Sequence, residues 1–407
     1  GINIPKEGFT AAPLAVEGRI LVGQSWGDRA TRGWLGSLDA ATGEEQWRWY
    51  AVPGPGVPGH ETWQDDHNAW KTGGAGMWTT GSYDVAQRLT IWGTGQPVPM
   101  FDPEYRPGDN LFTNAAVAVD IDEGTLQWHF QYTPNESWDY DENGVHILID
   151  VGGKQTVQHF ARSGFYYTLD RTDGSYVNSG QYVDVVNWTA GIDDKTGLPV
   201  EYDPSKALQT YIPATRSHRG DDPKTACPTL IGGIRWQPVG YNPNTQTAFG
   251  SGSDGCFTMS IGQGSIPLGP DGGINADEGG GNNGRDGDSS YGPLYGGLWS
   301  IDATTGQKVA NFRYAYENLT GALPTAGGLV FTAWNDGFVT AHDDQSLQPL
   351  WRFSTGSPMK AAPISYAVGS KQYVAIIAGG RKGYHAKHFP PNFANARPGG
   401  FIVVFSL

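Results

Sequence analysis

Cysteine is nearly absent from the sequence: 407 residues contain two, Cys227 and Cys256. Neither stands in a Cys-x-x-Cys pattern, which argues against a zinc cluster and against covalently bound haem. A cysteine pair in a chain with few helix signals and many tryptophans is typical of a disulfide formed in an oxidising compartment. Two buried free thiols are the alternative.

Long apolar runs are also missing, since no stretch approaches the roughly 18 apolar residues of a membrane-spanning helix. The sequence does not begin with Met, a charged segment and an apolar core, so we expect that any signal peptide has been removed. Basic residues are few, because 27 Lys and Arg against 41 Asp and Glu give a net charge of −14. That charge disfavours nucleic acid and anionic membranes as partners and suits a soluble protein that meets a basic one.

Long helices are excluded by what the chain has in excess. It contains 59 Gly, 27 Pro and 15 Trp, and long helices do not tolerate so much Gly and Pro. Many short strands joined by tight turns do. Length alone would allow two domains, but we predict one all-β domain over residues 1–407.

One pattern recurs and predicts hairpins. It consists of an apolar residue, an Asp, a few small or polar residues and a Gly, followed by a Trp eight residues after the Asp. The full copies are 38–47 and 119–128, and weaker copies are 169–174, 301–306 and 342–351. In such a turn the Asp side chain bonds the turn backbone and the Gly takes a positive φ. The Trp would lie against the neighbouring repeat and satisfy its indole N–H there.

Alternating strands accompany these turns, as at 19–23 and 373–377. Repeats the size of a small sheet predict a β-propeller, with independent hairpins in a sandwich as the alternative. The Gly- and Asp-rich stretch 269–297 is predicted to be an inserted surface loop. A C-terminal loop is predicted at 379–400, before a last strand at 401–405.

Two carboxylates, Asp139 and Asp141, stand two positions apart behind Trp138. In an extended segment residues i and i+2 point to the same side, so we expect both to aim into one pocket. They would repel each other there unless one were protonated or a cation lay between them. An acidic surface loop is the alternative for such a pair taken by itself.

The acid pair is accompanied by segments with a shared family pattern. They are Ser25–Gly33, Gly73–Trp78, Gly93–Gln96, Pro107–Leu111, Thr133–Tyr140 and Thr325–Phe331. Together with the Asp-Gly-Trp turns, they resemble the quinoprotein alcohol dehydrogenases, which hold pyrroloquinoline quinone (PQQ) and a metal ion on the axis of an eight-bladed propeller. Cys227 and Cys256, 29 residues apart, look like a disulfide pair of methanol dehydrogenases. The resemblance covers essentially the whole chain.

The resemblance implies a role for each matching residue. Asp139 takes the place of the catalytic base, and Arg162 would contact the reactive quinone oxygens. The metal-ligand positions fall on Asp28, Gln96, Asp139 and Asp141. The cofactor contacts fall on Thr10, Ser25, Trp26, Gly27, Trp78, Arg162 and Arg235, with Trp78 beneath the ring. Asp141 lies where lanthanide-dependent members carry an additional carboxylate, which favours a lanthanide over Ca²⁺ because a trivalent ion offsets more negative charge.

The sequence departs from the family at several positions. Asp28 is one methylene shorter than the family's Glu and Gln96 one longer than its Asn, so we expect the ion or the ring to be displaced. Arg235 replaces an Asn that touches the cofactor and Leu319 a Trp at its edge, which leaves the alcohol open. The family's first blades have no counterpart here, nor do its vicinal Cys pair and an Arg that binds the cofactor. We expect one segment of a longer protein, with an incomplete propeller as the alternative.

The resemblance thus implies a periplasmic PQQ- and metal-dependent dehydrogenase that oxidises an alcohol, with Asp139 as base. Electrons would pass to a separate, soluble c-type cytochrome, since the sequence has no Cys-x-x-Cys-His. The oligomeric state stays open, with a homodimer as one option. A non-catalytic propeller that serves as a scaffold or binding protein is the alternative. Such a scaffold has no reason to keep Asp139, Asp141, Arg162 and Trp78 together. A glycosidase with the acid pair lacks any signal for a sugar-binding groove.

Overall fold

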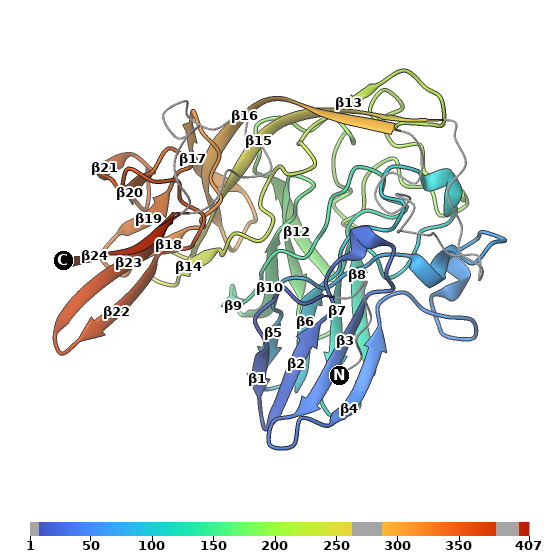
Figure 1. The fold of residues 1–407 in the computed structure, drawn as a ribbon, viewed down its shortest axis with the longest axis horizontal. Helices are drawn as coiled ribbons and strands as arrows, with labels where there is room; N and C mark the ends of the chain where they lie inside the picture. The colour runs from blue at the N-terminus through green and yellow to red at the C-terminus, as the bar shows by residue number, and fades with distance from the viewer. Residues whose placement is uncertain (1–7, 263–286, 380–398, 407) are drawn as a thin grey trace.

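The structure is a computed structural model that describes residues 8–262, 287–379 and 399–406 (Figure 1). Within them the chain forms β-strands and short 3-10 helices, without an α-helix. The 3-10 helices are η1 (Gly27–Arg29), η2 (His60–Thr62), η3 (Ala69–Thr72) and η4 (Pro103–Tyr105). No helix in the described ranges has the length and apolar character needed to cross a membrane.

The described strands form six antiparallel sheets that follow one another along the chain. The first contains β1 (Leu14–Val16), β2 (Arg19–Gly23), β3 (Trp34–Asp39) and β4 (Glu45–Tyr50). The second contains β5 (Ser82–Asp84), β6 (Leu89–Gly93), β7 (Ala115–Asp120) and β8 (Leu126–Gln131). The third contains β9 (His146–Val151), β10 (Lys154–Phe160), β11 (Phe165–Asp170) and β12 (Tyr176–Gln181).

The remaining sheets are less regular. The fourth contains β13 (Lys224–Ala226), β15 (Thr247–Ile261), β16 (Gly287–Asp302) and β17 (Lys308–Tyr314), with β14 (Gly240–Asn242) paired to β15. The fifth contains β18 (Leu323–Pro324), β19 (Leu329–Ala333), β20 (Phe338–Asp343) and β21 (Pro349–Ser354). The sixth has three strands, β22 (Ile364–Val368), β23 (Lys371–Gly379) and β24 (Gly400–Ser406). Successive meanders of about four strands are the blade architecture that the repeats predict.

The repeat turns form as the sequence predicts. Asp39 accepts hydrogen bonds from the backbone N–H groups of Ala41 and Thr42, both at 2.9 Å, and Gly43 has a φ of 75°. The turns at Asp120, Asp170 and Asp302 follow the same scheme, with their glycines at positive φ. In the turn after Asp343 the position of the glycine is taken by Leu347, which adopts a φ of 56°.

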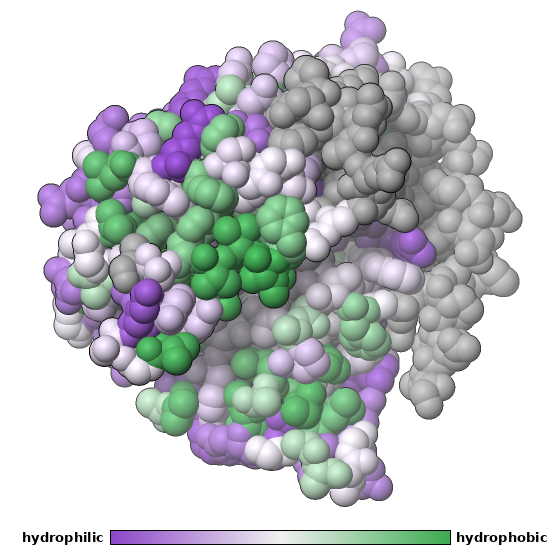
Figure 2. Space-filling view, turned by 60° about the vertical axis from the view of Figure 1, so that its left-hand side comes forward, coloured by the Kyte–Doolittle hydropathy of each residue, from purple (hydrophilic) through white to green (hydrophobic). Residues whose placement is uncertain are grey.

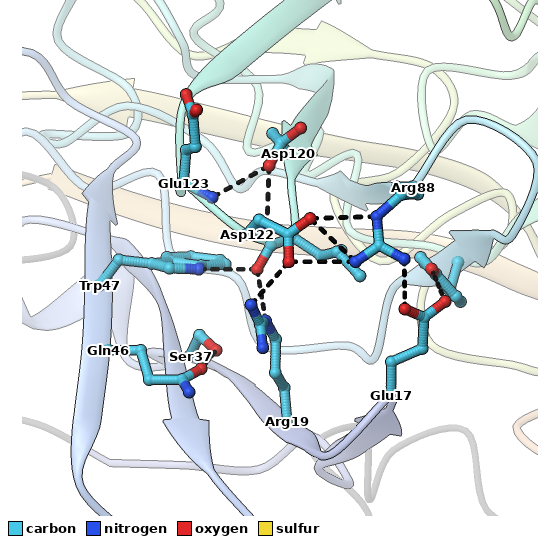
Figure 3. Close-up of polar contacts among 11 residues, drawn as sticks. Glu17, Arg19, Ser37, Gln46, Trp47, Arg88, Asp120, Asp122 and Glu123 are labelled. Atoms are coloured by element: carbon cyan, nitrogen blue, oxygen red, sulfur yellow. Dashed lines mark hydrogen bonds and ion pairs between the residues drawn. The ribbon is translucent and has the colours of Figure 1, made fainter.

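Two of the repeat tryptophans dock on the turn glycine of the next sheet. The Trp47 indole N–H donates to the carbonyl of Ile121 at 2.9 Å, and its ring covers Gly124, where an added Cβ would lie 2.5 Å from the ring (Figure 3). Trp128 repeats the contact on Gly174 and donates to the carbonyl of Arg171 at 3.1 Å. Only a glycine leaves room for an indole at this distance.

Surface charges surround the first of these contacts. Arg19 of β2 donates to the carbonyl of Ile121 at 2.8 Å and pairs with Asp122 at 2.6 Å (Figure 3). Arg88 also pairs with Asp122, at 2.8 Å, and with Glu17. These side chains are partly exposed, so water and salt screen the pairs and each contributes little to stability. The half-buried indole of Trp47 therefore contributes more to the interface between the sheets than the ion pairs do.

One predicted loop is partly wrong. Residues 269–286 lie outside the described residues, but residues 287–297 belong to β16, where Gly287 pairs with Ile261 and Gly297 with Gly252. This segment pairs with the edge of the long strand β15, and the pairing satisfies its backbone N–H and C=O groups. Its glycine-rich composition taken alone suggests a loop. The predicted loop 379–400 falls between β23 and β24, with residues 380–398 outside the described part, and the predicted last strand 401–405 lies within β24.

The C-terminal sheets carry an exposed apolar surface. Figure 2 turns this side of the molecule forward and shows hydrophobic side chains gathered on it. The exposed residues are Leu350, Trp351, Phe353, Ile364, Tyr366, Val368, Ile377, Phe401, Ile402 and Val404. Trp351 is the repeat tryptophan of the fifth sheet, and it packs edge-on against Phe405 of β24 at 4.9 Å between ring centroids, not on a turn glycine.

The docking of Trp128 yields a prediction for stability. Trp128→Ala removes a buried indole and its hydrogen bond, so we expect it to lower the free energy of unfolding by about 3–5 kcal/mol. The exposed substitution Val85→Ala serves as the control and should change it by less than about 0.5 kcal/mol. Urea unfolding followed by circular dichroism measures both, and equal midpoints for the two variants would contradict the docking role.

Candidate active site

The acid pair lies in the loop between β8 and β9, and this loop is not extended at Asp139. Asp139 has a φ of 66°, in the left-handed region. The expectation that strand alternation points Asp139 and Asp141 to one side is therefore wrong. Their carboxylates nevertheless meet, since both bind the same guanidinium: Arg162 Nη2 lies 3.0 Å from Asp139 and Arg162 Nη1 lies 2.5 Å from Asp141.

Arg162 follows β10 and is completely buried. Its backbone N–H donates to Glu142 Oε2 at 3.0 Å, and the same oxygen lies 2.9 Å from His159 Nε2. Burial lowers the pKa of Arg162, but the negative charges of Asp139 and Asp141 outweigh burial and raise it overall. Arg162 is thus a permanent cation that is held in place by its backbone N–H and by its guanidinium.

The buried carboxylate of Glu136 shapes the loop that carries the acid pair. Glu136 accepts hydrogen bonds from the backbone N–H groups of Trp138 and, at 3.0 Å, of Tyr140. Two buried arginines also bind this segment. Arg106 donates to the carbonyl of Glu136 at 2.5 Å, and Arg216 donates to the carbonyl of Asn135 at 3.0 Å. These contacts maintain the left-handed conformation of Asp139.

A cavity of about 470 Å³ opens beside the acid pair. Its size falls within the range of cofactor sites in proteins. It is lined by Thr10, Ser25, Trp26, Gly27, Asp28, Trp78, Asp141, Arg235 and Trp236. The structure thus brings the predicted cofactor contacts Thr10, Ser25, Trp26, Gly27, Trp78 and Arg235 together around one space, with Arg162 reaching it through Asp141.

The cavity wall is built by hydrogen bonds between distant segments. Thr10 Oγ1 bonds Ser25 Oγ at 2.9 Å and donates to the carbonyl of Trp78 at 3.0 Å. The backbone N–H of Trp78 donates to Asn143 Oδ1 at 3.0 Å, and Asn143 Nδ2 donates to the carbonyl of Gly76 at 2.9 Å. Asn143 therefore ties the tryptophan wall to the loop of the acid pair.

Asp28 and Gln96 also lie at this site. Gln96 Nε2 donates to Asp28 Oδ1 at 2.5 Å, and the backbone N–H of Gln96 donates to Asp141 Oδ1 at 2.9 Å. Burial, and next the charge of Asp141, raise the pKa of Asp28. Burial also raises the pKa of Asp139 well above its usual range, with Arg162 opposing the shift.

The side chains of Asp28, Gln96, Asp139 and Asp141 are of the types that bind a hard cation. Carboxylate and amide oxygens are its preferred ligands, and a positive ion beside Asp28 and Asp141 would offset the repulsion that raises the pKa of Asp28. In the described residues no three His, Cys, Asp or Glu side chains form a metal cluster. Arg162 binds Asp139 and Asp141, and Gln96 binds Asp28. The ligand set Asp28, Gln96, Asp139 and Asp141 stays a prediction.

Sequence reasoning missed three residues of the site. Trp236 lines the cavity, and its ring meets that of Trp78 at 6.3 Å between centroids. Asn143 and Glu142 hold Trp78 and Arg162, and their position beside the acid pair was the available signal. Leu319 is buried and is not among the lining residues.

The predicted disulfide is confirmed. Cys227 and Cys256 are bonded, with their Cα atoms 4.4 Å apart. The bond joins the segment after β13 to the long strand β15, whose neighbouring residues already pair, as Ala226 does with Phe257. It therefore reinforces the fourth sheet next to the segment that leads to Arg235.

Sequence comparisons identify a consistent set of relatives. The model of the family described as "PQQ: Glucose/ethanol/alcohol dehydrogenase, beta-propeller domain" matches residues 3–187. Quinoprotein alcohol dehydrogenase PedH of Pseudomonas putida is 32% identical over 412 residues, which are 92% of this chain and 64% of the relative. A lanthanide-dependent methanol dehydrogenase of Methylacidiphilum fumariolicum is also 32% identical, over 92% of this chain and 62% of its own. The chain therefore spans less than two thirds of the length of these relatives.

Solved structures agree with the sequence relatives. A europium-containing methanol dehydrogenase superposes with a TM-score of 0.81 at 28% identity, over 98% of this chain and 74% of that one. Quinohemoprotein alcohol dehydrogenase from Comamonas testosteroni gives a TM-score of 0.80 at 26% identity, over 98% and 60%. The predicted resemblance and the predicted all-β propeller fold are both confirmed.

The buried position of Glu136 predicts a pH dependence of stability. Burial raises its pKa from 4.5 to about 7, so the folded state keeps a proton that the unfolded state releases. The free energy of unfolding should therefore fall as the pH rises from about 4.5 to about 7. Glu136→Gln keeps an acceptor for the two N–H groups without the titration, and we expect a flatter profile in urea unfolding across this window.

Glu136→Ala is the matched comparison. It leaves the N–H groups of Trp138 and Tyr140 without their acceptor, which should cost about 1–3 kcal/mol at every pH. A Gln variant with the pH profile of the unaltered protein would show that Glu136 is not the titrating group.

Proposed function

The chain is homologous to the PQQ-dependent alcohol dehydrogenases, and on this basis we propose that it is the catalytic propeller of a quinoprotein that oxidises an alcohol to an aldehyde or ketone. The observation that supports the proposal most directly is the pairing of Asp139 and Asp141 with Arg162 beside a cavity lined by tryptophans. Geometry of this kind combines a base, a fixed cation and room for a flat cofactor.

Asp139 is the proposed base. Its raised pKa makes it a stronger proton acceptor than an exposed carboxylate, while the charge of Arg162 opposes the shift and favours the ionised form. In the reaction the proton of the substrate hydroxyl passes to a carboxylate oxygen of Asp139. PQQ held in the cavity beside Trp78 would supply the acceptor for the hydride of the alcohol carbon, which leaves a carbonyl product.

Arg162 is the proposed electrostatic partner of the reaction. Because it is buried and bonded through its backbone and its side chain, it needs no reorganisation when negative charge develops nearby. The same contacts orient Asp139, whose carboxylate would otherwise be free to rotate. Arg162 thus holds the base and stabilises charge at the same site.

The cavity walls fit a planar, anionic cofactor. Trp78 offers an aromatic face, and Thr10, Ser25 and the backbone N–H groups of Trp26 and Gly27 offer hydrogen bonds to carboxylates. Gly27 and Gly76 approach closely, because a Cβ on Gly27 would lie 3.2 Å from the Gly76 nitrogen. Larger residues at either position would push these two segments apart.

We further propose that Asp28, Gln96, Asp139 and Asp141 hold one metal ion, a lanthanide in preference to Ca²⁺. A bound hard cation acts as a Lewis acid toward the quinone. Asp141 supports the lanthanide because it adds a carboxylate at the cavity wall, where Gly95 leaves it room: a Cβ on Gly95 would lie 2.6 Å from its Oδ1.

The proposed electron acceptor is a soluble c-type cytochrome, and the proposed location is the periplasm. Relatives named quinohemoprotein alcohol dehydrogenases match 91% of this chain, which supports electron transfer to a haem group. The net charge of −14 would assist docking of a basic partner. The disulfide Cys227–Cys256 supports an oxidising compartment.

Reconstitution tests the proposed activity. The purified chain, freed of metal by a chelator, is supplied with PQQ plus Ca²⁺ or La³⁺ and assayed for dye reduction with several alcohols. We expect activity with La³⁺ and quenching of tryptophan fluorescence as PQQ binds beside Trp78. Asp139→Asn should abolish dye reduction and leave the quenching. Quenching without activity in the unaltered protein, with either ion, would contradict the enzyme proposal.

Asp141→Ala tests the choice of metal. Because Asp141 supplies the additional carboxylate, its loss should reduce activity supported by La³⁺ more than activity supported by Ca²⁺, by roughly tenfold or more for a lost charged ligand. The measurement is the ratio of the two activities at saturating ion. An equal loss with both ions would mean that Asp141 does not discriminate between them.

A further inference from the structure

Arg235 is a cation at the cavity wall that no carboxylate in the described residues pairs with. It follows β13 along the chain, and its guanidinium lies over the ring of Trp236, 4.7 Å from the centroid, and 6.0 Å from that of Trp78. Within the described ranges it forms no ion pair, and its Nε is buried without a hydrogen-bond partner. A half-buried cation in this state is costly unless an anion joins it.

The acidic groups that face Arg235 are engaged elsewhere. Asp139 and Asp141 bind Arg162, and Asp28 accepts a hydrogen bond from Gln96. Glu317 also faces Arg235, but it is buried and accepts a hydrogen bond from Ser253 at 3.2 Å. Burial raises the pKa of Glu317 to about 7, so much of it is neutral near neutral pH. Arg235 therefore has no direct carboxylate contact in the described residues, although the charges of Asp139, Asp141 and Asp28 act on it from a distance.

Arg235 remains a cation in these surroundings. Burial, and next the charge of Arg162, lower its pKa to about 10, which is still well above neutral pH. The two tryptophan rings cover part of its planar surface. A ring over the face of a guanidinium leaves the edge with its N–H groups available, and this edge matches the two oxygens of a carboxylate.

We propose that Arg235 is an anion-binding position of the cavity and that it takes a carboxylate. The inference rests on the proposed function and deepens it, because two molecules of that reaction can supply the group. One is the cofactor. The other is an alcohol substrate with a carboxylate at its far end, a hydroxy acid. In the second case Arg235 selects the substrate class.

Carboxylate binding is measured directly, without turnover. The purified chain is titrated with 4-hydroxybutanoate and with butan-1-ol, which has a methyl group in place of the carboxylate, and tryptophan fluorescence reports on Trp78 and Trp236. We expect saturable binding of the hydroxy acid and binding at least roughly tenfold weaker in Arg235→Gln. Arg235→Lys, which keeps the charge but not the planar pair of donors, should be intermediate.

Arg313→Gln is the matched control. Arg313 also lies over an aromatic ring, 3.8 Å from the centroid of Tyr295, but it lies outside the cavity and its side chain is 53% exposed. Its removal changes the net charge by the same amount, so it should leave the titration unaltered. Equal losses in the Arg313 and Arg235 variants would show a general effect of charge and would overturn the proposal.

Two further arms identify the source of the carboxylate. If the substrate supplies it, Arg235→Gln lowers the ratio of kcat/KM for 4-hydroxybutanoate over butan-1-ol about tenfold or more, with PQQ affinity unchanged. If the cofactor supplies it, PQQ affinity falls by a similar factor and the ratio is unchanged. Both results support an anion position at Arg235, and no change in hydroxy acid binding, PQQ affinity or ratio overturns it. Because the fluorescence titration needs no activity, failure of the proposed function would leave its result readable.

Discussion

The site depends on the ion pairs that the guanidinium of Arg162 forms with Asp139 and Asp141. This guanidinium joins the loop after β8 to the hairpin between β10 and β11, and it is bonded to Asp139 and Asp141 at full burial. Removing one partner from such a group leaves an uncompensated buried charge, which costs about 3–5 kcal/mol. The left-handed conformation of Asp139 and the N–H groups bonded by Glu136 are the local conditions under which both carboxylates reach it.

The sheets supply the rigid frame around this contact. Trp47 and Trp128 each donate an indole N–H to the next turn and lie on a glycine there. In the third repeat Asn178 takes the place of the tryptophan and still donates to the carbonyl of Thr304 at 3.1 Å. The docking of neighbouring sheets is therefore a property of the hydrogen bond and of the glycine, not of the indole alone.

Three carboxylates, Asp28, Asp139 and Asp141, face two guanidinium groups at the cavity, those of Arg162 and Arg235. Arg162 binds Asp139 and Asp141, the amide of Gln96 contacts Asp28, and Arg235 contacts no carboxylate in the described residues. A metal ion and an anionic cofactor would enter as opposite charges in this arrangement: the ion toward Asp28 and Asp141, and the anion toward Arg235.

The sequence by itself determined the repeat turns and the all-β propeller class, because they depend on short motifs with their own local chemistry, and its two cysteines indicated a disulfide. The predicted residues around the cavity followed from the family resemblance. Only the tertiary structure decided how these residues meet. Strand alternation would align Asp139 and Asp141, yet a left-handed residue and a guanidinium from another hairpin bring them together. The strand at residues 287–297 likewise depends on the edge of β15 and not on its own composition. Trp236 and the unpaired Arg235 become visible only when segments far apart in the chain enclose one space.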